Sequence, residues 1–211
     1  TGGWQYLPAV HHPAHTPLLD PSDARVTVGG YDDYPELYTR WFQYATFLPI
    51  FRTHGSRPAN EVWSYGKQAE PTLEKYLRLR YQLMPYIYSL AYNNWQTGAP
   101  IMRALPLDFP ADPKVAQIGN EYMLGPAFLV APVTEQGATT KQVYLPAGVD
   151  WYNFWTGERL KGGQTIEVSA PIDTIPLFVR AGSILPLGSP VENTHQAQTI
   201  GARVPDAGLM A

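Results

Sequence analysis

The 211-residue chain contains no cysteine, few charged side chains and no evident membrane span. The absence of cysteine excludes disulfides and thiol chemistry within these residues, although it assigns no redox compartment. The 15 lysine and arginine residues are scattered and the formal net charge is -3, so we expect no basic patch and no nucleic-acid partner. No signal peptide is visible, but the chain starts at Thr1 and not at a methionine. The cellular location therefore stays unknown.

Aromatic residues, by contrast, are abundant. They make up 13% of the chain, with 14 tyrosines and 6 tryptophans. Such rings serve core packing and sugar stacking alike. The count permits a carbohydrate site without requiring one.

The most informative segment is residues 31–55, where an aromatic-rich helical pattern leads into a short run that ends in Arg52, Thr53 and His54. On a strand, residues two apart point the same way. At the carboxyl end of a barrel strand, Arg52 and His54 would both project into the ligand site. Surface or supporting positions for the same pair stay open at this point.

The first 125 residues predict alternating helices and strands. Asp32 and Asp33 precede Pro35, as helix-capping residues do, and neighbours on one segment diverge too much to form a catalytic pair. The helix that follows is expected to carry Leu37, Trp41, Tyr44 and Leu48 on one face. Further expectations are a strand at 50–53, a helix at 71–94 that is kinked at Pro85 and stopped by Gly98, a final barrel strand at 99–105 and a helix at 115–124.

Short β runs separated by glycine and proline follow Gly125. This spacing is typical of an antiparallel sandwich. The runs are 127–133, 141–145, 151–155, 165–169 and 177–180. We therefore expect a barrel portion at 1–125, a β-sandwich domain at 126–191, and an irregular, weakly ordered tail at 192–211.

Several segments resemble family 31 of the glycoside hydrolases, the α-glucosidases and α-xylosidases. The resemblance covers the chain from Thr1 to about Leu187. It rests on TGGW at 1–4, ELYTRWFQ at 36–43, RYQLMPY at 80–86, MLGPAFLVAPV at 123–133, WYNFWTG at 151–157 and IPLFVRAG at 175–182. It implies the carboxyl-terminal part of a (β/α)8 TIM barrel followed by an antiparallel β-sandwich, an α/β plus all-β fold class.

The resemblance also implies roles for single residues. The family's aspartate nucleophile and aspartate acid/base are expected to precede Thr1, so none of these residues would be catalytic. Trp4 would form a wall of the sugar site, while Arg52 and His54 would donate hydrogen bonds to sugar hydroxyls. Glu61 would order the loop that follows them. The family implies no cofactor.

His11, His12 and His15 are close enough in the sequence to suggest a metal site. Pro13 rules out a regular helical ligand face there, and no nearby carboxylate or cysteine completes a site. We therefore expect no metal, and contact with bound sugar is the favoured role of this loop.

The implied function is that of a retaining α-glycosidase acting on xyloglucan-type or α-glucan oligosaccharides. RTHGS at 52–56 and NEVWSYG at 60–66 favour an α-xylosidase over an α-glucosidase. We expect the fragment alone to be inactive. The alternatives are a non-catalytic carbohydrate-binding fragment, with Trp151 or Trp155 as a stacking platform, and a non-functional fragment without a stable fold. The oligomeric state stays open.

Overall fold

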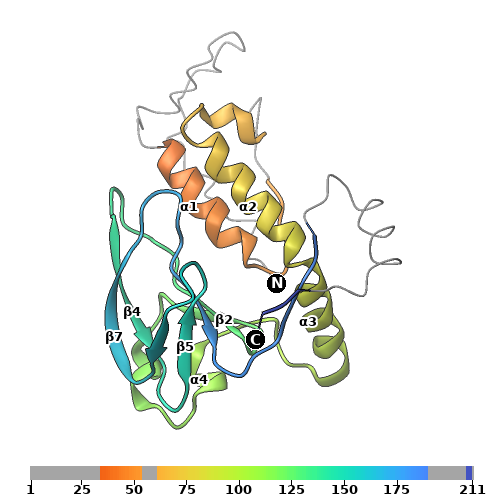
Figure 1. Ribbon diagram of the computed structural model, residues 1–211, viewed down its shortest axis with the longest axis vertical. Coiled ribbons are helices and arrows are strands. Elements are labelled where there is room, and N and C mark those ends of the chain that lie inside the picture. Colours follow the sequence, from red (N-terminus) through yellow and green to blue (C-terminus); the bar gives the residue numbers. More distant parts are fainter. Residues whose placement is uncertain (1–33, 54–60, 190–207, 211) are drawn as a thin grey trace, which may run out of the picture.

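A computed structural model describes residues 34–53, 61–189 and 208–210 of the chain (Figure 1). Its helices are α1 (Tyr34–Thr46), η1 (Val62–Tyr65), α2 (Glu70–Gln82), α3 (Met84–Thr97), α4 (Leu105–Asp108) and η2 (Pro113–Gln117). Its strands are β1 (Met102–Arg103), β2 (Tyr122–Leu124), β3 (Phe128–Val130), β4 (Thr140–Leu145), β5 (Asp150–Asn153), β6 (Arg159–Lys161), β7 (Gln164–Ser169), β8 (Leu177–Arg180), β9 (Leu185–Leu187) and β10 (Gly208–Met210).

The amino-terminal half of the described chain is helical, with α1 and α2 side by side (Figure 1). The predicted helix at 71–94 is present as two helices that meet at Leu83, with Pro85 in the first turn of α3. Gly98 ends α3 as predicted. It has a φ of 74°, in the left-handed region, and its amide donates to the carbonyl of Asn94 at 2.8 Å.

The buried face of α1 differs from the predicted one. Tyr38, Phe42 and Ala45 are buried in the core, whereas Trp41 and Tyr44 are half-buried beside a pocket. Because both stripes of α1 are aromatic, periodicity alone did not separate the core-facing stripe from the pocket-facing one.

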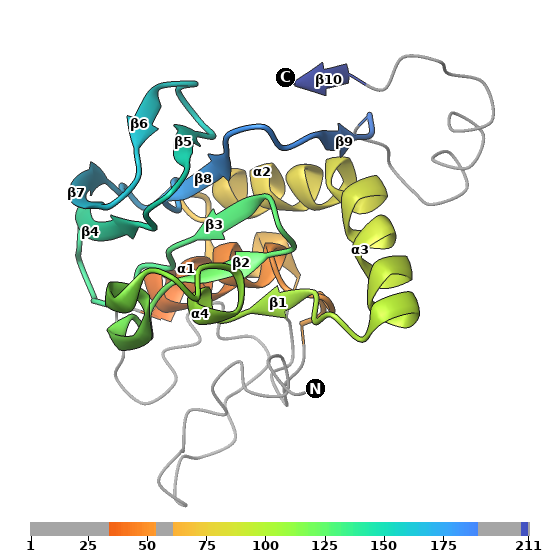
Figure 2. The ribbon, with the colours of Figure 1, turned by 90° about the horizontal axis from the view of Figure 1, so that it is seen from below.

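Six antiparallel strands form the main sheet, in the order β1-β2-β3-β8-β5-β6, and β4 and β7 pair as a separate ribbon. The two ribbon strands lie side by side at the end of the molecule away from α3 (Figure 2). A helical part is thus followed by an antiparallel β-sheet domain, in the order that the predicted fold class requires.

Both faces of the central strands are buried. Tyr122 and Leu124 on β2 pack into the core shared with the helices, whereas Met123 between them packs into a second core. That second core includes Trp151 of β5 and Val143 of β4. This alternation follows the twofold period of a strand and shows why β2, β3 and the start of β8 read as unbroken apolar runs.

Three predicted elements were wrong. Residues 50–53 form no strand, since no described strand lies beside them to complete a ladder. Residues 99–105 contain the two-residue strand β1 and the first residue of α4, and β1 pairs antiparallel with β2, so it belongs to the main sheet instead of the barrel. Residues 115–124 hold the end of η2 and then β2. The predicted helix was wrong because a strand buried on both faces lacks the polar alternation that distinguishes it from a helix.

The predicted division at residue 125 stays a prediction, although the main sheet begins before it, at Met102. In the predicted weakly ordered tail, Gly208–Met210 form β10, which pairs antiparallel with β9. The rest of the tail lies outside the described residues. In the described part of the chain, no helix combines the length and the apolar character needed to cross a membrane.

Candidate functional site

Two of the four residues expected at or beside the sugar site belong to the described structure. Arg52 is exposed at the end of the segment that follows α1. Glu61 is exposed at the start of η1, where its carboxylate accepts a hydrogen bond from the hydroxyl of Ser64 at 3.1 Å. Trp4 and His54 lie outside the described residues. The roles of all four stay predictions.

The other candidate polar residues of the sequence also lie outside the described part of the chain. These are Asp32, Asp33 and the three histidines of residues 11–15. Among the described residues, no three His, Cys, Asp or Glu side chains converge as they would around a metal ion.

The segment that carries Arg52 is held by an arginine that sequence reasoning missed. Arg80, a buried residue of α2, donates hydrogen bonds to the backbone carbonyls of Thr46 at 2.8 Å, Pro49 at 3.0 Å, and Leu48. Burial lowers the pKa of Arg80 to about 10, which leaves it charged at neutral pH. The spacing in the sequence could have indicated that Arg80 is buried. Arg80 lies seven residues, about two helical turns, after Leu73 and therefore on the apolar stripe of α2.

Tyr122 of β2 reaches the same turn from the sheet. Its hydroxyl lies 3.5 Å from the carbonyl oxygen of Tyr44 and 3.4 Å from that of Phe47. Burial raises the pKa of Tyr122 well above its ordinary value, so the hydroxyl keeps its proton and acts as a donor. The end of α1 is therefore contacted by side chains from both α2 and β2.

A second set of hydrogen bonds joins the helices to the β domain. The guanidinium of Arg40 donates to the carbonyls of Ala138 and Ala170 at 2.9 Å and of Pro171 at 3.0 Å. Next to it, Gln43 donates to the carbonyl of Ile172 at 2.6 Å. These bonds hold α1 against the β domain and thereby restrict the position of its carboxyl end.

The helix α2 contributes to the same junction. The hydroxyl of Tyr76 accepts a hydrogen bond from the amide of Ile175 at 2.9 Å, and Lys75 donates to the carbonyl of Asp173 at 2.8 Å. The loop from Ala170 to Ile175 is thus held by side chains of both long helices that flank the Arg52 segment.

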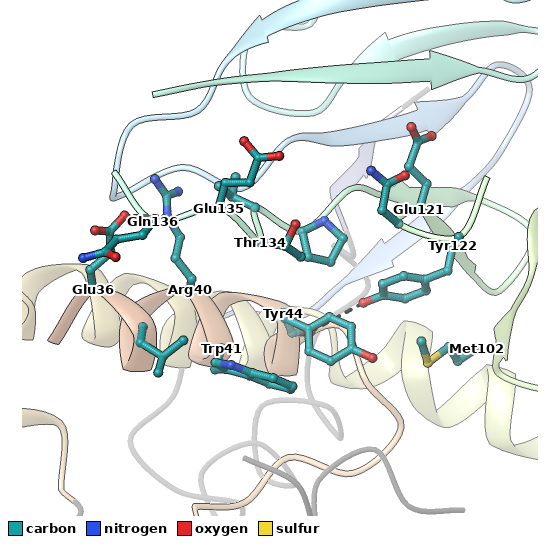
Figure 3. A pocket seen from close by; sticks show the side chains of 15 residues that line it. Glu36, Arg40, Trp41, Tyr44, Met102, Glu121, Tyr122, Thr134, Glu135 and Gln136 are labelled. Atoms are coloured by element: carbon teal, nitrogen blue, oxygen red, sulfur yellow. Dashed lines mark hydrogen bonds and ion pairs between the residues drawn. The ribbon is translucent and has the colours of Figure 1, made fainter. Parts of the chain in front are cut away.

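A pocket of about 430 Å³ lies between α1 and the loops that flank β2 and follow β3 (Figure 3). Trp41 and Tyr44 line it along α1 with ring centroids 5.7 Å apart, and Tyr122 and Glu121 lie across from them. Glu36, Glu135, Asn120 and Gln136 add further polar groups to the lining. Aromatic rings beside carboxylates and amides can stack on and hydrogen-bond to a small polyhydroxylated molecule.

Two buried carboxyl groups of the β domain have structural partners. Glu121 accepts a hydrogen bond from the amide of Tyr144 at 2.8 Å, and burial raises its pKa to about 7. Asp112 accepts from the hydroxyl of Tyr144 at 2.7 Å and from the amides of Ala147 and Lys114 at 2.8 and 3.1 Å. Burial opposes ionisation of Asp112, but these hydrogen bonds hold its pKa below the ordinary value.

The suggested stacking platform on the β domain was wrong for Trp151. Its side chain is fully buried in the second core, and its indole N–H donates to the carbonyl of Pro146 at 3.1 Å. Trp155 is half-buried, donates to the carbonyl of Ile175 at 2.7 Å, and has the Lys75 ammonium 4.6 Å from its ring centroid. Both rings serve packing.

Two models of one protein family match the chain. The model of the glycosyl hydrolases family 31 TIM-barrel domain matches residues 25–90, and that of the family 31 C-terminal domain matches residues 98–185. The first strand of the main sheet, β1, lies within the second match, in agreement with its pairing to β2 of the same domain.

Curated relatives of the chain include glycosidases of two specificities. The chain is 47% identical over 164 residues to an α-xylosidase of Saccharolobus solfataricus, which covers 77% of the chain and 22% of that protein. It is 39% identical over 173 residues to α-glucosidase 2 of Bacillus thermoamyloliquefaciens, and this match covers 80% of the chain and 22% of that protein. The chain thus spans about a fifth of the length of these relatives.

Solved structures agree with these matches. A family 31 α-xylosidase from Xanthomonas citri superposes with a TM-score of 0.75 at 54% identity, over 77% of this chain and 18% of that one. A family 31 α-xylosidase from a soil metagenome, in complex with xylose, superposes with a TM-score of 0.70 at 38% identity, over 72% of this chain and 25% of that one.

Proposed function

Because the chain belongs to family 31 of the glycoside hydrolases, we propose that it supplies sugar-binding residues and the carboxyl-terminal β domain of a retaining α-glycosidase. The observation that carries the proposal is the consecutive match of its two halves to the barrel and C-terminal domains of the family. Solved relatives are in complex with xylose or glucose, which supports a carbohydrate as the proposed ligand.

In this proposal, Arg52 and His54 donate hydrogen bonds to the hydroxyls of the sugar whose linkage is cut, and Trp4 packs against its ring. Glu61 orders the loop after His54. The planar guanidinium of Arg52 suits two neighbouring hydroxyls because its donors have a fixed geometry. These bonds assist hydrolysis to the extent that they strengthen as the ring flattens in the transition state.

Retention at the anomeric carbon requires two carboxyl groups about 5 to 5.5 Å apart, one as nucleophile and one as acid/base. We propose that both are contributed by a part of the polypeptide outside these 211 residues. The chain alone should then release no aryl group from aryl α-xylosides or α-glucosides. Turnover by the purified chain would place the two carboxylates within it.

The decisive experiment substitutes Arg52 and His54 in the longest natural chain that contains these residues. Either change to alanine should lower kcat/KM for an aryl α-glycoside by about 100-fold or more, which corresponds to about 3 kcal/mol of transition-state binding. Thr53→Ala is the matched control, because Thr53 is an exposed neighbour of Arg52 for which no sugar contact is proposed. Near-normal kinetics for Arg52→Ala and His54→Ala would return both residues to a structural role.

We propose an α-xylosidase before an α-glucosidase, since two of the three α-xylosidases compared above reach 47% and 54% identity, whereas the third reaches 38% and the α-glucosidase 39%. Xylose lacks the hydroxymethyl group of glucose, so selection depends on whether the pocket has room for it. The ratio of kcat/KM for p-nitrophenyl α-xyloside and α-glucoside measures this choice. A ratio below one would favour the α-glucosidase.

The second candidate is carbohydrate binding without catalysis, and the pocket beside α1 favours it. Its volume of about 430 Å³ suits a small sugar, and Trp41 and Tyr44 offer ring faces next to the carboxylates of Glu36 and Glu135. Titration of the 211-residue chain with xyloglucan oligosaccharide, followed by tryptophan fluorescence, tests it. Trp41→Ala should abolish the response and Trp63→Ala, which removes an exposed ring not among those that line the pocket, should not. An unchanged response of Trp41→Ala would exclude this pocket.

A further inference from the structure

The end of α1 lacks the usual means of satisfying its last carbonyls. A helix leaves four carbonyl groups without intrahelical donors at its carboxyl end, and a glycine in the left-handed conformation often supplies the missing bonds. Here the helix ends at Thr46, and the chain continues through Phe47 and Leu48 to Pro49 without a glycine. The amides of Phe47 and Leu48 satisfy the carbonyls of Tyr44 and Ala45, which leaves the following carbonyls dependent on side chains.

Arg80 supplies those donors from the neighbouring helix. One of its terminal nitrogens donates to Thr46 and Leu48, and the other donates to Pro49. Because the guanidinium is planar and its donors cannot move independently, the three carbonyls are held in one arrangement. The cation also lies at the negative end of the α1 dipole, where positive charge is favoured.

The contact continues toward the sugar-binding segment. The ring of Phe51 lies 5.8 Å from the guanidinium carbon of Arg80 and packs edge-on against Phe42 of α1 at 4.9 Å. Arg52 is the next residue after Phe51 and the third after Pro49. The backbone that leads into Arg52 is thus fixed both at its carbonyls and through the ring of Phe51.

We propose that Arg80 is a positioning residue that sets the place of Arg52 in the sugar site. This inference rests on the proposed function, because it gives Arg80 no contact with sugar and lets it act through the turn at residues 46–49. Tyr122 supports the same turn from the β domain, so the C-terminal domain also contributes to the geometry of the barrel site. A displacement of about 1 Å in a positioned group can cost about 100-fold in rate.

A double-mutant cycle between Arg80 and Arg52 tests the proposal, in the longest natural chain that contains these residues. Arg80→Lys keeps the charge, but a single nitrogen cannot reproduce the fork that reaches three carbonyls. It should lower kcat/KM for the aryl α-glycoside by about 10- to 100-fold. In the Arg52→Ala background the same change should alter kcat/KM by less than about threefold, because the group that it positions is already absent.

Arg78→Lys is the control, because Arg78 is an exposed residue of the same helix that pairs with Glu74 and should leave kcat/KM unchanged. Tyr122→Phe is a second variant in case Arg80→Lys fails to fold. It removes only the hydroxyl near Tyr44 and Phe47, and it should show a smaller loss with the same dependence on Arg52. Near-ultraviolet circular dichroism checks the fold of each variant.

The outcomes separate this inference from the proposed function. Equal losses for Arg80→Lys with and without Arg52 would show that Arg80 serves general stability, which overturns the positioning role alone. Wild-type kinetics for Arg80→Lys would overturn it as well. Wild-type kinetics for Arg52→Ala would overturn both the positioning role and the proposed sugar contact.

Discussion

Replacement of Arg40 should destabilise the chain more than any other single change at the junction between helices and sheet. The side chain is only 7% exposed and its guanidinium donates three hydrogen bonds to carbonyls of residues 138, 170 and 171. Burial lowers the pKa of Arg40, with Glu36 opposing that shift, and this direction marks a cation removed from water. Arg40→Met keeps most of the apolar stem while removing all three donors.

The size of the effect follows from two opposing contributions. A hydrogen bond from a charged donor contributes about 1.5 to 3 kcal/mol net, so three such bonds set a large gross loss. Removing the guanidinium also relieves its own desolvation penalty of several kcal/mol. The carbonyls left without donors in a partly buried loop keep the balance unfavourable, and we expect a loss of about 3 kcal/mol.

Urea unfolding of the 211-residue chain, followed by near-ultraviolet circular dichroism, measures this loss from the midpoint at constant slope. Arg78→Ala is the matched control, since Arg78 also pairs with a glutamate four residues earlier but is 64% exposed. It should cost at most about 0.5 kcal/mol. If Arg40→Met costs no more than Arg78→Ala, the hydrogen bonds of Arg40 do not hold the junction and the reasoning fails.

Three further changes test other parts of the structure. Burial raises the pKa of Glu121 from 4.5 to about 7, so the native chain should lose about 3 kcal/mol of stability as pH rises through this window. Glu121→Gln should remove this loss, which is measured as the difference in unfolding free energy between urea titrations at pH 5 and pH 8. The same pH dependence in the wild type and in Glu121→Gln would contradict it. Gly125→Ala should cost more than about 2 kcal/mol of stability, because φ is +59° and the added Cβ would meet the side chain of Leu90. The control Gly157→Ala, at φ +73° in open space, should cost about 1 kcal/mol. Equal shifts of the urea midpoint for the two variants would exclude the clash. Asp112→Ala should cost about 2 kcal/mol at pH 7, since three donors lose their acceptor, and a change below about 0.5 kcal/mol would show that water replaces it.

Long elements with local signals were predictable from the sequence. The helix before Phe47, the helical pattern interrupted near Pro85 and the stop at Gly98 all depend on residues close in the chain. Two of the five predicted β runs beyond Gly125 contain their strands, β3 and β8, within their bounds, and the strands β4, β5 and β7 each begin one residue before the corresponding run. The strand at 50–53 and the helix at 115–124 failed because their state depends on which neighbours they meet.

The sequence by itself determined the family, the helix-then-sheet order and the position of Arg52 in the chain. Each of these follows from short runs of residues whose types and spacing carry the information. Only the tertiary structure decided that Arg80 and Tyr122 converge on the turn before Arg52, and that Arg40 joins α1 to a loop about 130 residues away. A side chain that donates to distant backbone carbonyls leaves no pattern in the sequence, because any residue can supply a carbonyl and only the fold selects which one it is.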